Sequence, residues 1–96
     1  MVLGTLRVTL HIPHSHSLKE KRMVVRSLVD RLRRQFNVAV AEIDDQDVWQ
    51  VATLGAVVIS ADSRHADEMV RKVLDVIEAQ EGDALITQSH VELVHV

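Results

Sequence analysis

Strand-like and helix-like hydrophobic patterns follow one another along this 96-residue chain in the order strand, helix, strand, strand, helix, strand. Residues 5–12 alternate apolar and polar side chains, with the period of two that is typical of a half-buried strand. Pro13 ends this pattern because proline has no N–H to donate to a neighbouring strand. The same reasoning predicts further strands at 38–43, 49–60 and 84–94.

The two helical patterns have recognisable ends. Ser17 and Glu20 form a capping box that predicts the start of the first helix, and Asn37 is expected to end it. The second helix is expected to begin at Asp62 or Ser63. We expect Gly82 to end it.

With right-handed crossovers, this order of elements has one compact solution. It is a four-stranded antiparallel sheet with both helices on one face, the ferredoxin-like βαββαβ fold of the α+β class. A length of 96 residues suits a single domain covering 1–96.

The composition is that of an ordinary globular protein, with 47% hydrophobic and 26% charged residues. The absence of cysteine excludes disulfides, thiolate nucleophiles and cysteine-ligated metals. No apolar run approaches the roughly 20 residues of a membrane helix, and the N-terminus lacks the layout of a signal peptide. These features favour a cytoplasmic protein.

The third strand pattern is apolar on both faces, with Val51, Val57 and Ile59 on one side and Leu54, Ala56 and Val58 on the other. One set must lie away from the helices, and exposing it would forfeit several kcal/mol at about 25 cal/mol per Å². We therefore expect a homodimer in which a second copy covers this face, with Trp49, Val57 and Ile59 in the interface. Long strand ends or the C-terminal tail are the alternative cover.

The net charge of −3 conceals a strong asymmetry, since residues 17–36 carry a local charge of +5 and the remainder −8. Lys19, Lys21 and Arg22 occupy the first turns of the first helix, where the macrodipole already carries about +0.5 charge. Each cation there costs roughly 0.3–1 kcal/mol unless an anion is bound nearby.

Lys19, Arg22, Arg26 and Arg33 also share an arc of about 60° on the helix, a geometry that suits a phosphate backbone. The competing interpretation is that the chain's own acids pair with these cations. The acids within reach would be Glu42, Asp44, Asp45 and Asp47. Lys21 points nearer the apolar arc, so its stem could cover the core while its tip is paired.

Several segments resemble a known family. They are Ser17-Leu18-Lys19-Glu20-Lys21-Arg22, Phe36-Asn37-Val38-Ala39-Val40-Ala41-Glu42, Asp47-Val48-Trp49-Gln50 and Gly55. Together they resemble the YlxP-like family of small bacterial proteins, also called domain of unknown function 503. The resemblance implies a ferredoxin-like fold and a cytoplasmic protein. It also implies, through the translation genes beside which family genes often sit, an association with RNA or the ribosome. It supplies no catalytic residues.

Other chemistry finds little support in the sequence. His11, His14 and His16, with His90 or His95, could bring imidazoles together for zinc or nickel, but no dedicated metal motif is present. No spacing arranges a serine, a histidine and an acid into a nucleophilic set. Acylphosphatases share the topology, but their glycine-rich phosphate loop is missing. We expect no enzyme, no metal and no cofactor.

The sequence therefore predicts a non-enzymatic binding module. Its basic first helix would engage RNA or the ribosome through Lys19, Lys21, Arg22, Arg26 and Arg33. Base stacking of the RNA-recognition-motif kind is disfavoured, because Trp49 is the sole aromatic residue near the open sheet face. The alternative is a homodimeric protein-interaction module that uses the apolar sheet face, with the basic cluster engaged only in salt bridges.

Overall fold

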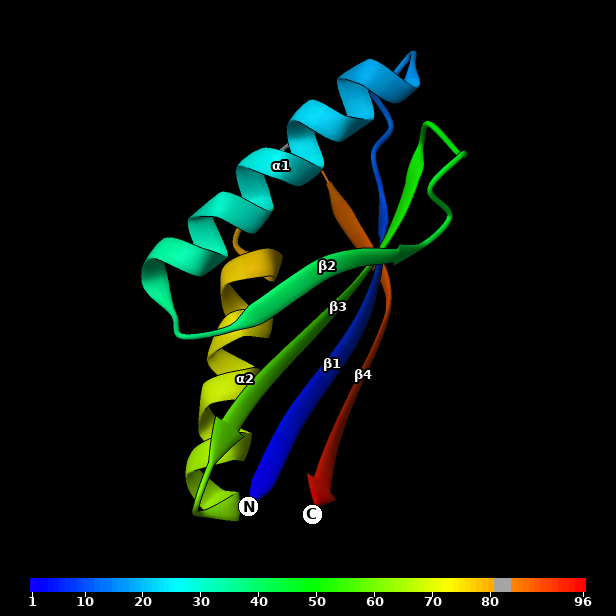
Figure 1. Cartoon of the computed structure of the whole chain (residues 1–96). Helices are drawn as coiled ribbons and strands as arrows, with labels where there is room; N and C mark the ends of the chain where they lie inside the picture. The colour runs from blue at the N-terminus through cyan, green and yellow to red at the C-terminus, as the bar shows by residue number, and fades with distance from the viewer. Residues whose placement is uncertain (81–83) are drawn as a thin grey trace.

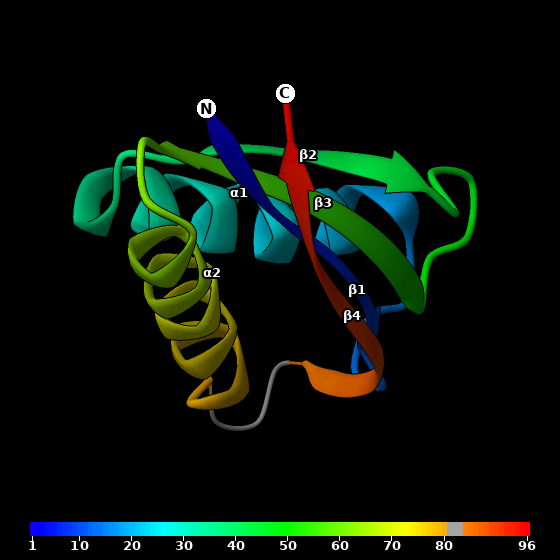
Figure 2. The same ribbon diagram turned by 90° about the horizontal axis from the view of Figure 1, so that it is seen from below.

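A computed structural model describes residues 1–80 and 84–96 (Figure 1). The elements are β1 (Val2–His11), α1 (Leu18–Gln35), β2 (Ala39–Asp44), β3 (Val51–Ser60), α2 (Ser63–Glu78) and β4 (Leu85–His95). The strands form one antiparallel sheet in the order β2-β3-β1-β4. Both helices lie on the same face of this sheet (Figure 2). The expected βαββαβ ferredoxin-like fold is confirmed.

The helix starts follow the predicted N-caps, although the Glu20 side chain accepts from the His16 N–H and not from the Ser17 N–H of a standard capping box. The Ser17 hydroxyl accepts a hydrogen bond from the Glu20 N–H at 3.1 Å, and the Asp62 carboxylate accepts one from the Arg64 N–H at 3.0 Å. Helix α1 ends at Gln35, two residues before Asn37. The predicted stop at Gly82 lies outside the described residues. Neither α1 nor α2, the helices of the described ranges, combines the length and apolar character that a membrane crossing requires.

The sheet buries alternate residues against the helices. On β3, Leu54, Ala56 and Val58 are buried, which settles which of the two apolar sets faces the core. Val57 and Ile59 stay 37% and 55% exposed on the opposite face. The C-terminal residues, considered above as a cover for that face, instead form the edge strand β4 (Figure 1).

Helix α2 packs very closely on β1 at Gly4. A Cβ atom added at Gly4 would lie 2.9 Å from the Ala66 carbonyl oxygen and 2.9 Å from Val58 Cγ2. Glycine is needed here because the backbone of α2 cannot move away without disturbing the core.

We expect Gly4→Ala to lower the free energy of unfolding by about 1–3 kcal/mol through overpacking, measured by urea denaturation. Gly55→Ala is the matched control. Its Cβ would meet only the Ile43 side chain, at 3.1 Å, and a side chain can rotate away. A Gly55→Ala variant that is less stable than Gly4→Ala would contradict this reading of the packing.

Candidate functional site

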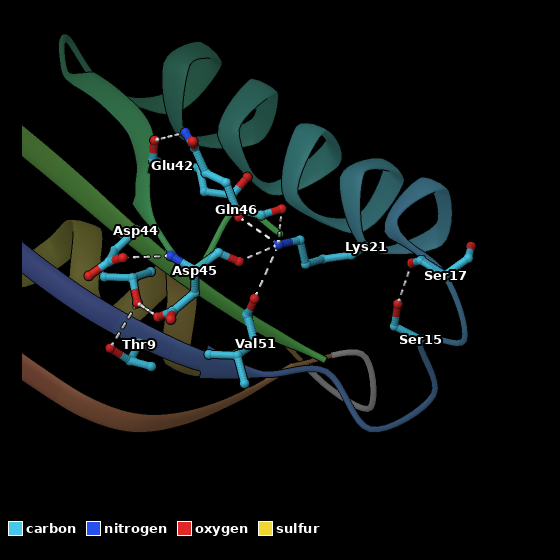
Figure 3. A network of polar contacts seen from close by, with 10 residues as sticks. Thr9, Ser15, Ser17, Lys21, Glu42, Asp44, Asp45, Gln46 and Val51 are labelled. Carbon is cyan, nitrogen blue, oxygen red and sulfur yellow. Dashed lines mark hydrogen bonds and ion pairs between the residues drawn. The ribbon is translucent and has the colours of Figure 1, made fainter. Parts of the chain in front are cut away.

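Lys21 is the most deeply placed of the predicted basic residues. Its side chain extends from α1 toward the β2–β3 loop and is fully buried (Figure 3). The ammonium Nζ donates hydrogen bonds to the carbonyl oxygens of Asp45, Gln46 and Val51 at 2.8, 3.0 and 3.2 Å. Three donors therefore meet three acceptors, which uses the full donor capacity of a lysine.

Glu42 supplies the compensating charge. Its Oε2 atom lies 2.9 Å from Lys21 Nζ, and its side chain is only 16% exposed. A buried ammonium is tolerated when it is both paired and hydrogen-bonded, and Lys21 meets both conditions. The expectation that Lys21 binds an external anion is therefore wrong. The alternative, in which its stem lies on the core and its tip is paired, is confirmed.

The acids at the end of β2 and in the β2–β3 loop have other partners. Asp44 pairs with Arg7 on β1 at 3.2 Å. The Asp45 carboxylate accepts a hydrogen bond from the Thr53 hydroxyl at 2.7 Å, and its backbone has φ 60, a left-handed conformation that aspartate tolerates. Within residues 1–80 and 84–96, no ion pair joins these acids to the remaining basic residues of α1.

Three arginines of α1 line a groove between this helix and the edge strand β2. The groove has a volume of about 380 Å³, and Arg22, Arg26 and Arg33 lie along it. Arg33 is fixed in place, because its Nη2 donates to the Val40 carbonyl oxygen at 3.0 Å. Lys19 is exposed but does not line the groove, so the predicted row of four cations becomes a row of three.

The groove is basic overall although two acids also line it. These are Asp30 and Glu42, and Glu42 is already engaged by Lys21. Among the ion pairs of the described residues, none involves Arg22 or Arg26. By contrast, Arg64 and Arg71 on α2 pair with Glu68 and Asp67, four residues away in each case.

The open face of the sheet carries a second hollow, of about 640 Å³. Its floor is made of small residues that include Ala39, Ala41 and Gly55, and Ile43 and Val57 stand beside it. Polar side chains from β1 and β4 also border it, namely Arg7, His90 and Glu92. The predicted interface residues Val57 and Ile59 thus lie on an exposed surface, and their role in an interface stays a prediction.

Trp49 lies in the loop before β3 and is 49% exposed. It is therefore not a core residue, and its predicted place in an interface stays a prediction. His14 and His16 are exposed in the connection between β1 and α1. In the part of the chain that the structure describes, no three histidine, aspartate or glutamate residues come together as metal ligands would.

These features define a small ferredoxin-like protein with a basic groove on one edge. Two designed proteins share the architecture at low sequence identity. One has a ferredoxin fold, with a TM-score of 0.59 and 17% identity over 95% of this chain and 85% of its own. The other, Foldit4, has a TM-score of 0.54 and 13% identity over 99% of this chain and 97% of its own.

The chain belongs to the family described as "Protein of unknown function (DUF503)", which matches residues 3–91. It is also 35% identical over 63 residues to the "Uncharacterized protein YlxP" of Bacillus subtilis (strain 168). That match covers 66% of this chain and 68% of the relative. The resemblance noted in the sequence is therefore confirmed.

Proposed function

We propose that this protein is a non-enzymatic, cytoplasmic binding module whose groove between α1 and β2 binds the phosphate backbone of RNA, free or in the ribosome. The observation that carries the proposal is the row of Arg22, Arg26 and Arg33 along one groove. Arginine binds phosphate oxygens through a planar fork of N–H donors, which suits it to this task.

The position of the groove fits contacts to a backbone better than contacts to bases. It lies along an edge of the sheet, and the described residues place no aromatic side chain in its lining. Without stacking platforms, affinity would come from charge, with release of counterions and little preference for sequence.

Titration of the wild-type chain with a 20-nucleotide single-stranded RNA tests the proposal, with fluorescence anisotropy as the readout. Three phosphate contacts predict a slope of about −2 for the logarithm of the affinity against the logarithm of salt concentration. Raising salt from 50 to 200 mM should then weaken binding roughly 20-fold. No binding at 50 mM, or binding that does not change with salt, would overturn the proposal.

A second candidate function is favoured by the open sheet face. This face could bind a protein partner, including a second copy of the chain packed face to face. It offers the hollow over Gly55 and the exposed side chains of Val57 and Ile59. In that case Ile59→Cys would form a disulfide-linked dimer on mild oxidation. An Ile59→Cys variant that stays monomeric would argue against a face-to-face homodimer.

A further inference from the structure

The two edges of the sheet differ in how their outward-facing backbone groups are satisfied. At the β2 edge, side chains cap two outward carbonyl oxygens. Arg33 Nη2 donates to the Val40 carbonyl at 3.0 Å and Gln46 Nε2 donates to the Glu42 carbonyl at 3.2 Å. Such capping is one way in which proteins stop an edge strand from recruiting another chain.

The opposite edge, β4, lacks this protection. It is 11 residues long, and the sequence of Leu85–His95 holds neither the lysine nor the proline that commonly blocks an edge. Its side chains are mostly exposed, and Figure 1 shows it at the border of the sheet. Within residues 1–80 and 84–96, the one side chain that donates to a β4 carbonyl is Thr5, which reaches Glu92 from β1 rather than from the free side.

Antiparallel geometry identifies the outward-facing groups of β4. The backbone of Val96 bonds to Met1 through both its N–H, at 2.9 Å, and its C=O, at 2.7 Å. Bonded and non-bonded pairs alternate along an antiparallel ladder. Since Val96 is a hydrogen-bonded residue, every second residue before it is also hydrogen-bonded. The backbone groups that bond to β1 therefore belong to the even-numbered residues of β4. The N–H and C=O groups that face the open edge therefore belong to Ser89, Val91, Leu93 and His95.

We propose that β4 pairs in antiparallel fashion with β4 of a second copy of this chain, about a two-fold axis through Val91. The polar side chains favour this register, because an imidazole N–H can donate a hydrogen bond to a carboxylate. It places His90 opposite Glu92 of the other copy, twice, and Val91 opposite Val91. A shift by one step in one direction would set the Glu92 carboxylate against the Glu92 carboxylate of the other copy, and like charges directly opposite are destabilising. A shift in the other direction would set His90 against His90 and lose both contacts between His90 and Glu92.

The pairing would produce a closed dimer with one continuous eight-stranded sheet. It would not grow further, because the remaining edges are the capped β2 strands. The two basic grooves would lie at the far ends of this sheet, so the dimer does not depend on the proposed RNA binding.

Disulfide trapping tests the register directly, since the chain has no cysteine of its own. In Val91→Cys the two Cα atoms would be about 5.5 Å apart, within disulfide range. Ser89→Cys is the matched control. In this register Ser89 faces Leu93 of the other copy, so the two cysteines would lie roughly 13 Å apart. We expect at least tenfold more cross-linked dimer from Val91→Cys than from Ser89→Cys.

Equal cross-linking of the two variants, or cross-linking of Ser89→Cys alone, would overturn the proposed register. Sedimentation of the wild-type chain gives a readout that needs no substitution. A dimer at micromolar concentration supports the proposal, and a monomer up to 100 micromolar, roughly the range of weak association, would overturn it. A dimer that cross-links through Ile59→Cys but not through Val91→Cys would also overturn it and would place the interface on the sheet face.

Discussion

Lys21→Ala is expected to lower the free energy of unfolding by about 3–5 kcal/mol, as measured by urea denaturation. Removing the ammonium leaves Glu42 as a poorly solvated charge without its partner and takes away a donor from three carbonyl oxygens. Loss of one member of a buried pair is costly for this reason, whereas loss of both is often close to neutral.

Two further variants separate this explanation from a general loss of packing. Lys19→Ala, two residues earlier on the exposed surface of α1, should change stability by no more than about 0.5 kcal/mol. The double variant Lys21→Met and Glu42→Leu should recover the part of the loss that comes from the unpaired Glu42 carboxylate, but not the part that comes from the three carbonyl oxygens. If Glu42→Leu made no difference in the Lys21→Met background, the ion pair would not be the cause.

The double variant Arg22→Ala and Arg26→Ala is expected to weaken RNA binding about 30-fold at low salt. Each exposed contact between unit charges contributes about 1 kcal/mol at 4 Å in water, and 1.4 kcal/mol corresponds to a factor of ten. Both side chains are exposed, so the fold should remain intact. The anisotropy titration described for the wild-type chain measures the change.

Arg64→Ala with Arg71→Ala provides a control with the same change in net charge. These two arginines lie on α2 and pair with their own helix's acids, at 3.4 and 3.0 Å, away from the groove. Their removal should alter RNA affinity by a factor of about two or less, since long-range effects of exposed charges are screened. Equal losses from the two double variants would mean that net charge alone, and not the groove, drives binding.

The sequence predicted the fold well because periodicity and capping are local signals. The alternation along β1, the capping box at Ser17 and the aspartate cap at Asp62 each reflect contacts within a few residues. The boundaries near Trp49 were less accurate. The apolar residues Val48 and Trp49 lie in the loop just before β3, so a hydrophobic pattern cannot mark Val51 as the residue where β3 begins to pair with β1.

The site was predicted in part. The helical arc correctly grouped Arg22, Arg26 and Arg33, because spacing along a helix fixes which side chains share a face. The sequence predicted a paired tip for Lys21 as one of two interpretations, but it did not predict the partners, because these are mostly backbone carbonyls of a distant loop. Carbonyl groups carry no sequence signal, and their convergence depends on the positive φ of Asp45 and the path of the loop. The proximity of Lys21 to the apolar arc was the available clue.

The salt dependence of RNA binding, compared between the wild-type chain and the Arg22→Ala, Arg26→Ala variant, tests the central claim most directly. If the groove holds three phosphates through its three arginines, the slope should change from about −2 to about −0.7, since each single-strand contact contributes about 0.7. A slope that stays the same in both proteins would show that Arg22 and Arg26 do not contact phosphate and would contradict the account.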